Sequence, residues 1–369
     1  MKCAVAESQE PTSYPFGWFD WFCVWYPPAW LILFNRHWQH YKPDPDGWRW
    51  SEYVLFLLPG GFYIGLLIRW LRLAVRHRLE TSDRSSDASI PATSCSDSTP
   101  SDPDYQRAFR EEVLAPIVKR YFRAELHNFE NLPRSGPLLV ALNHAGMCFP
   151  WDFLALAVLL TEQQSWFVQP LAHPLFFDHP WLNWWLPKGW AQVLGGVRAD
   201  AESFEAAIAQ KTVILYAPES WRGLAKGWNH RYELAKFDAS FVRLSIQYQV
   251  PILPVVCIGN EWLHPFAFNV NGFARLAKMP MFPISPLIPM FALFPSMGVW
   301  AVRSRLQYFV QPLWRPWESL PPQTELPRQA TVYRLAQKLR AQLQRSISQL
   351  LKEEGRRQKD KGDREAGGG

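Results

Sequence analysis

Cysteine is scarce in this 369-residue sequence, and the cysteines lie far apart along the chain. The five cysteines are odd in number, scattered along the chain, and form no Cys-x-x-Cys pair. They are Cys3, Cys23, Cys95, Cys148 and Cys257. We therefore expect neither a disulfide framework nor a zinc site, and a reducing compartment fits this pattern.

Uninterrupted apolar runs long enough to cross a bilayer are also missing. The run from Phe16 to Phe34 is broken by Asp20 and by two prolines, and the run from Tyr53 to Ile68 spans 16 residues. A spanning helix needs about 20. We interpret both runs as re-entrant or in-plane membrane anchors, with the arginines that follow Ile68 at cytoplasmic-side headgroups. A buried helical hairpin of a soluble domain is the alternative. Neither run resembles a cleavable signal peptide.

Aromatic residues and positive charge are plentiful. The sequence has 20 Trp and 24 Phe, and its net charge is +6. Tryptophan favours boundaries that are apolar on one side and wet on the other, and a basic protein favours anionic partners. Because no zinc-finger, basic-zipper or RNA-binding signature is present, we predict membrane lipid as the partner, and no nucleic acid.

Composition divides the chain into four segments. Residues 1–79 are the aromatic, apolar region predicted to associate with a membrane, and residues 80–104 are a Ser/Asp-rich linker predicted to be disordered. Residues 105–325 carry the main domain. Residues 326–369 are predicted to form an amphipathic helix and a charged tail.

Within the main domain, helical and strand patterns alternate. Helices are predicted near 105–125, after Pro150, and over 201–211 and 232–248, with strands over 137–142, 166–169, 212–217 and 252–257. This alternation predicts a mixed α/β fold with a largely parallel sheet flanked by helices. The segment from Met279 to Trp300 is too rich in proline to predict a helix.

The stretch VALNHAGMCFPWD, residues 140–152, ends a buried strand in polar groups. His144 follows the strand, where open α/β folds place reacting groups. It is a candidate general base, with Asp152 holding the imidazole through Nδ1. The alternative is a histidine that bonds a backbone carbonyl, beside an aspartate near a helix start.

Two further stretches place arginines on predicted loops or turns. Glu219 and Arg222 follow the strand over 212–217, where a guanidinium can grip an anionic headgroup. Arg198 lies in a glycine turn before a helix, a location that suits phosphate. Alternatively, Arg222 pairs with Glu219 and Arg198 faces solvent.

Together these stretches resemble the glycerolipid acyltransferase family, whose members include lysophosphatidate acyltransferases. The blocks occur in family order, and the resemblance covers about Val118 to Leu313. They are Asn143-His144 with Asp152, Gly196-Val197-Arg198, Pro218-Glu219 with Arg222, and Val250 to Val255. The resemblance implies that His144 is the base, that Asp152 orients it, and that Asn143, Arg198, Glu219 and Arg222 bind substrate.

Two departures from the family pattern stand out. Seven residues separate His144 from Asp152 where the family usually has four, so Gly146 to Phe149 must bulge outward for the pair to meet. Ser220-Trp221 replace the usual Gly-Thr of the third block, and the tryptophan fills space where backbone would approach a phosphate.

The predicted function is a membrane-associated acyltransferase with its active site on the cytoplasmic side. It moves an acyl chain from an acyl carrier protein or coenzyme A thioester to the hydroxyl of a glycerolipid, such as a lysophospholipid, without metal, cofactor or covalent intermediate. Three alternatives remain open. Cys148 is a nucleophile activated by His144, the acceptor is a different alcohol, or the protein binds lipid without catalysis.

Overall fold

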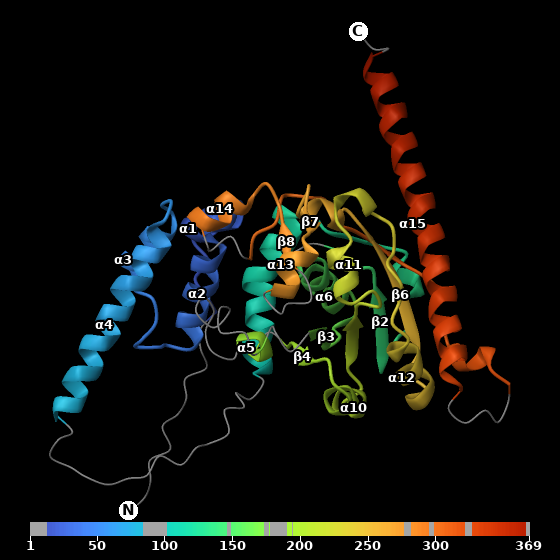
Figure 1. Ribbon diagram of the computed structural model, residues 1–369, viewed down its shortest axis with the longest axis horizontal. Coiled ribbons are helices and arrows are strands. Elements are labelled where there is room, and N and C mark those ends of the chain that lie inside the picture. The colour runs from blue at the N-terminus through green and yellow to red at the C-terminus, as the bar shows by residue number, and fades with distance from the viewer. Residues whose placement is uncertain are drawn as a thin grey trace, which may run out of the picture.

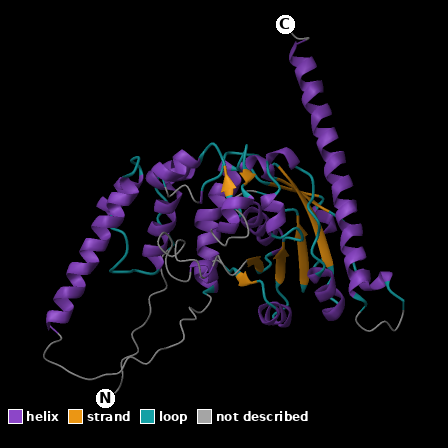
Figure 2. Cartoon of the chain, in the orientation of Figure 1, coloured by secondary structure: helices purple, strands orange, loops and turns teal. Residues whose placement is uncertain are grey.

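A seven-stranded sheet forms the centre of the molecule, in the order β1-β9-β6-β2-β5-β3-β4 (Figures 1 and 2). The computed structural model describes residues 13–83, 102–145, 149–172, 177, 190–193, 195–276, 282–294, 299–321 and 327–366. Neighbouring strands run parallel except β6 and β9. The predicted mixed, largely parallel sheet is thereby confirmed.

The strands of this sheet are β1 (Glu125–His127), β2 (Leu138–Leu142), β3 (Val168–Ala172), β4 (Val197–Arg198), β5 (Val213–Tyr216), β6 (Ile252–Ile258) and β9 (Gln307–Val310). A separate antiparallel pair consists of β7 (Phe268–Asn269) and β8 (Pro283–Ile284). Every residue of β2 and β6 is buried. Continuous apolar runs of this kind belong to strands covered on both faces.

Alternate residues of β2 enter two different hydrophobic cores. Val140 and Leu142 face a core that includes α6 (Trp151–Gln164), while Leu139 and Ala141 face a core that includes α12 (Ser240–Tyr248) and α15 (Gln329–Ala366). Side chains of a strand alternate between the faces of its sheet, so each face is sealed by its own helices.

The remaining helical elements connect these layers. Those before β2 are α5 (Pro103–Phe109), the π-helical turns η3 (Arg110–Leu114) and η4 (Ile117–Tyr121), and the 3₁₀ turn η5 (Phe129–Asn131). Those after β3 are α9 (Trp190–Val193), α10 (Ala201–Ala209), α11 (Trp221–Ala225), η6 (Trp228–His230), η7 (Asn260–Leu263), α13 (Asn271–Leu276), α14 (Ile288–Leu293) and η9 (Pro316–Ser319).

The first apolar run of the sequence contributes directly to the core. It forms α1 (Trp18–Trp25), η1 (Pro27–Ala29) and the start of α2 (Trp30–Tyr41). Trp30 is fully buried, with its ring centroid 4.7 Å from that of Trp151, and Phe34 packs 5.3 Å from Phe109. Residues 29–34 are thus buried, as the helical-hairpin alternative requires. Within the described residues, no helix combines the length and apolar character needed to cross a bilayer.

The second apolar run forms α3 (Trp50–Phe56) and the beginning of α4 (Gly61–Asp83). Arg72 pairs with Glu52 at 3.2 Å, and Arg76 pairs with Asp46 at 2.7 Å. Arg69 lies 4.8 Å from the centroid of the Trp48 ring. Acidic and aromatic groups of residues 46–52 therefore engage these three arginines. The expectation that the arginines after Ile68 lie at lipid headgroups stays a prediction.

The predicted helix over 232–248 begins eight residues late, at Ser240. Tyr232 has a positive φ of 63°, and the backbone N–H groups of Leu234 and Ala235 donate to the side chains of Gln344 and Glu219. Donors used in this way are not available for helical hydrogen bonds.

Three boundary predictions also need correction. The proline-rich segment contains a short helix, α14, because its proline occupies the first turn, where no hydrogen bond is lost. The linker is shorter than predicted, since α4 extends to Asp83 and α5 begins at Pro103, and residues 84–101 lie outside the described residues. The predicted amphipathic C-terminal helix is longer, and it buries Val332 and Leu339 against the sheet.

Candidate active site

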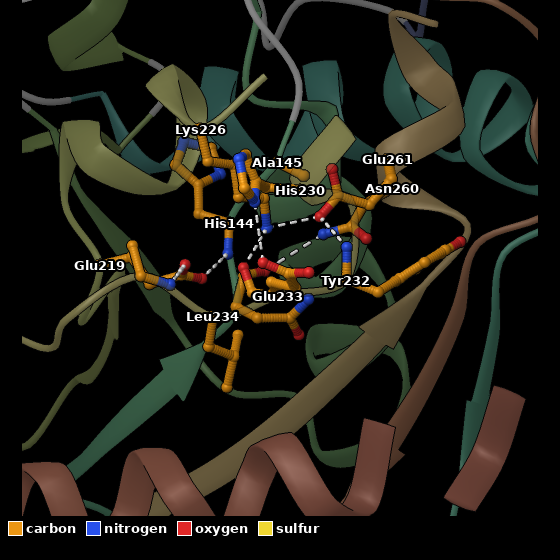
Figure 3. Close-up of polar contacts among 12 residues, drawn as sticks. His144, Ala145, Glu219, Lys226, His230, Tyr232, Glu233, Leu234, Asn260 and Glu261 are labelled. Atoms are coloured by element: carbon orange, nitrogen blue, oxygen red, sulfur yellow. Dashed lines mark hydrogen bonds and ion pairs between the residues drawn. The ribbon is translucent and has the colours of Figure 1, made fainter. Parts of the chain in front are cut away.

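Three strands deliver polar side chains to one edge of the sheet. His144 follows β2 by two residues, Glu219 follows β5 by three, and Asn260 follows β6 by two. Because the strands are parallel and in register, their carboxyl ends meet at this edge. Figure 3 shows the three side chains around one centre.

His144 and Asp152 form the hydrogen-bonded pair that the sequence predicted. His144 Nδ1 lies 2.9 Å from Asp152 Oδ2 and 3.1 Å from Oδ1. Asp152 is fully buried in the first turn of α6, and its oxygens also accept the backbone N–H groups of Ala145 and Phe153, each at 3.0 Å. The seven-residue spacing therefore permits the contact. Residues 146–148, including Cys148, lie outside the described residues.

The imidazole is fixed through Nδ1 and is partly exposed. The His144 side chain is 12% exposed, and the edge of its ring meets Phe153 at a centroid distance of 4.7 Å. When Nδ1 donates to the carboxylate, Nε2 carries the free lone pair. In the described part of the chain, no hydrogen bond to Nε2 is found, so this nitrogen can accept a proton from a bound molecule.

Two further residues hold Asp152, and sequence reasoning missed both. The Tyr308 hydroxyl donates to the Asp152 backbone carbonyl at 2.7 Å. The Asn260 amide lies 3.4 Å from Asp152 Oδ2 and 3.3 Å from the Asn143 carbonyl oxygen. Both side chains are fully buried. The only sequence signal for Asn260 was its location just after the predicted strand over 252–257, and no sequence signal pointed to Tyr308.

Asn143 ties β2 to β6. Its side-chain amide donates to the Cys257 carbonyl at 3.0 Å and accepts the Cys257 N–H at 2.6 Å. With both ends of the amide occupied and the residue 2% exposed, the role shown for Asn143 is to fix the backbone before His144. Its predicted contact with substrate stays a prediction.

Glu219 lies beneath His144. One carboxylate oxygen accepts the His144 backbone N–H at 3.4 Å, and the other accepts the Ala235 N–H at 2.6 Å. Burial raises the pKa of this fully buried carboxyl, while nearby Lys226 acts to lower it. As the structure shows it, Glu219 supports the loop that carries the imidazole, and a contact with substrate stays a prediction.

The turn after Glu219 is strained and closely packed. Ser220 has φ 52° and ψ −150°, a conformation that glycine adopts far more readily. A Cβ added to Gly223 would lie 2.7 Å from the His144 carbonyl oxygen. Serine thus stands where the family has glycine, and Gly223 lets α11 approach the backbone of His144.

Arg222 and Arg198 lie on different elements. Arg222 is exposed on α11, 6.0 Å from the Trp221 ring centroid. Arg198 belongs to β4 and lies 5.0 Å from the centroid of the Phe177 ring. Since β4 is two places from β5 in the sheet, about 10 Å separates the two strands. The predicted phosphate clamp stays a prediction.

Metal ligands do not gather at this site. Among the described residues, no group of three or more His, Cys, Asp or Glu side chains could hold an ion.

Comparison with known proteins places residues 123–258 in a family model described as acyltransferase. Uncharacterized proteins of Mycobacterium bovis and Mycobacterium tuberculosis are 32% identical over 200 residues, and one of Mycobacterium leprae is 31% identical. The match covers 53% of this chain, and the chain spans about half the length of these relatives, 52% for the first two and 51% for the third.

A solved structure also shows a distant likeness. It is the crystal structure of the 1-acyl-sn-glycerophosphate acyltransferase PlsC from Thermotoga maritima. The two chains are 12% identical with a TM-score of 0.38, over 67% of this chain and 82% of the other.

Proposed function

We propose that this chain, whose residues 123–258 match a family model described as acyltransferase, transfers an acyl chain from a thioester to the hydroxyl of a glycerolipid. The observation that carries the proposal is the His144–Asp152 pair, in which Nδ1 lies 2.9 Å from Asp152 Oδ2 and the His144 side chain is 12% exposed. A lipid-binding protein without catalysis has no need to fix an imidazole in this way.

The proposed reaction has one covalent exchange. His144 Nε2 takes the proton of the acceptor hydroxyl as its oxygen attacks the thioester carbonyl carbon. The C–O bond forms, the C–S bond breaks, and the imidazolium returns the proton to the leaving thiolate. Asp152 holds the proton on Nδ1 and stabilises the positive charge that builds on the ring.

The other predicted site residues take different parts in this proposal. Arg222 and Arg198 bind the phosphate of the acceptor, since guanidinium groups pair well with phosphate oxygens. Asn143 fixes the backbone before His144 through its hydrogen bonds to Cys257, and Glu219 accepts the His144 backbone N–H. Coenzyme A or acyl carrier protein delivers the acyl chain, and both are acidic, which agrees with the net charge of +6.

We further propose that the carboxyl edge of the sheet faces a lipid surface on the cytoplasmic side. Figure 1 shows α1, α14, α11 and the β7–β8 pair along the edge where β5 and β6 end. Large apolar side chains are exposed on these elements and the adjoining η7. They are Trp18, Trp21, Phe22, Trp25, Trp221, Trp262, Phe268, Met290 and Leu293. Aromatic side chains at such a boundary support docking to lipid.

One experiment tests both parts. Purified protein is mixed with an acyl thioester and vesicles that contain a lysophospholipid, and thiol release and vesicle flotation are followed together. We expect acyl transfer and flotation, with His144→Ala reducing turnover by about 10²- to 10⁴-fold and leaving flotation intact. Cys148→Ala is the matched control and should remain active. If Cys148→Ala is inactive and His144→Ala remains active, the assignment of His144 as the general base is wrong.

A further inference from the structure

Tyr308 is a buried polar side chain that reaches the His144–Asp152 dyad from a strand with no predicted site residue. It belongs to β9, is fully buried, and its hydroxyl donates to the backbone carbonyl of Asp152 at 2.7 Å. This is the most common length of an O–H···O hydrogen bond. Because Asp152 lies in the first turn of α6, the bond fixes the backbone that carries the Asp152 carboxylate.

Cys257 of β6 lies opposite Tyr308 in the antiparallel β6–β9 pair and holds the other half of the dyad. Both ends of the Asn143 side-chain amide bind the Cys257 backbone, at 3.0 and 2.6 Å, and Asn143 immediately precedes His144. Opposite residues of an antiparallel pair are only about 4.5–5.5 Å apart. A single pair of opposite residues therefore holds the His144 side of the dyad through Cys257 and the Asp152 side through Tyr308.

Asn260 joins these two halves. Its amide NH₂ group lies 3.3 Å from the Asn143 carbonyl oxygen and 3.4 Å from Asp152 Oδ2. In the part of the chain that the structure describes, the Asn260 Oδ1 atom is buried without a hydrogen-bond partner. Such an oxygen is unfavourable, but turning the amide over would set it against two other acceptor oxygens. The bridge between Asn143 and Asp152 thus explains the orientation of Asn260. We call Tyr308, Cys257 and Asn260 the dyad brace.

The long connection between His144 and Asp152 makes the dyad brace important. Seven residues separate the pair, more than is usual in the family that the sequence resembles, and a longer connection restrains its ends less. The residue before Asp152 is also held from outside, since the Trp151 indole N–H donates to the Val299 carbonyl at 2.7 Å. Contacts from residues 260–308 therefore fix Trp151 and Asp152 in addition to the connection from His144.

We propose that Tyr308 is a positioning residue for acyl transfer and that Asn260 assists it. This inference rests on the proposed function. The two side chains keep the Asp152 carboxylate against His144 Nδ1, so that the proton stays on Nδ1 and the lone pair on Nε2. Both side chains are fully buried, so neither contacts a bound substrate. Their effect is on the chemical step and not on substrate binding.

Tyr308→Phe removes one oxygen and keeps the ring, and steady-state kinetics of thiol release measure the result. A displacement of about 1 Å at a reacting group can cost about 100-fold in rate, and we expect the smaller shift here to lower kcat about tenfold. The KM values for the thioester and the lysophospholipid should stay within about twofold of the parental values.

Tyr121→Phe is the matched control. Tyr121 is also buried, and its hydroxyl also donates to a backbone carbonyl, that of Ala301, at 3.0 Å. Both variants lose one buried hydrogen bond and should lose similar stability in urea, but Tyr121→Phe should keep the parental kcat. An equal fall in kcat for the two variants, an unchanged kcat in Tyr308→Phe, or an effect on KM alone overturns the proposal.

The imidazole N–H signal of His144 tests the dyad brace without any turnover. In protein with nitrogen-15-labelled histidine, the signal of the Nδ1 proton is assigned by its loss in His144→Ala. We expect its exchange with water to be at least about tenfold faster in Tyr308→Phe and in Asn260→Ala, because local opening becomes easier, and unchanged in Tyr121→Phe. Asn260→Ala carries the test if Tyr308→Phe does not fold, since it also removes the unpaired buried oxygen.

This signal separates the inference from the proposed function. If the parent acylates no acceptor but exchange accelerates as expected, acyl transfer fails and the dyad brace stands. If exchange is the same in the parent, Tyr308→Phe and Asn260→Ala, the dyad brace is wrong, even where acyl transfer is observed.

Discussion

Asp152→Asn is the most informative single substitution, because both oxygens of this buried carboxylate are in use. Oδ1 accepts the Phe153 N–H and Oδ2 accepts the Ala145 N–H, while His144 Nδ1 contacts both. Asparagine has one oxygen and one NH₂ group. Whichever way the amide turns, its NH₂ group faces one of these backbone N–H groups.

The structure sets the size of two separate effects. One buried backbone donor loses its acceptor, which costs about 1–3 kcal/mol in the free energy of unfolding. The second effect concerns the imidazole. If the NH₂ group donates to His144 Nδ1, the ring carries its proton on Nε2 and can no longer act as a base. Turnover should then fall by about 10³- to 10⁴-fold, as expected when a fixed imidazole holds the wrong tautomer.

Urea unfolding and a continuous assay of thiol release measure the two effects on the same samples. Asp104→Asn, at an exposed position in the first turn of α5, is the control and should change the free energy of unfolding by a few tenths of a kcal/mol. A folded Asp152→Asn variant that keeps more than a tenth of parental turnover refutes the dyad as the catalytic unit.

Three other perturbations follow from the same geometry. Gly223→Ala should lower turnover at least about tenfold, since its Cβ would displace the backbone of His144, whereas Gly272→Ala, with open space around it, should be neutral in the same thiol-release assay. Ser220→Gly should raise the free energy of unfolding by about 0.5–2 kcal/mol, because relief of about 1–3 kcal/mol of backbone strain exceeds the entropy cost of glycine. A urea titration that gives a lower free energy of unfolding for the variant would contradict this. Burial lowers the pKa of His264 from 6.5 to about 4, so the unfolded chain binds a proton at a higher pH than the folded chain does. The free energy of unfolding should therefore fall as the pH is lowered from 6.5 toward 4, by at most about 3 kcal/mol. Urea titrations at stepped pH measure this fall, and His264→Gln should reduce it.

Several features follow from local sequence alone. The strands β2 and β6 are continuous apolar runs bounded by polar or turn residues, so burial on both faces and a parallel sheet could be predicted without coordinates. His144 and Asp152 were identified because a strand end and a helix start are local patterns. The same local reasoning expected Arg198 and Arg222 on loops, whereas the structure places them on β4 and α11.

Tertiary structure decided how distant residues combine. Asn143 and Glu219 look like substrate ligands in sequence, yet their polar atoms bind the backbone of Cys257, His144 and Ala235. The first apolar run reads as a membrane anchor, yet Trp30 packs against a tryptophan that follows it by 121 positions. An apolar side chain is stabilised by any surface that excludes water, whether lipid or protein core, so composition cannot distinguish the two. Hydrogen bonds likewise depend on which donors and acceptors folding brings within about 3 Å, and only the packed chain sets those distances.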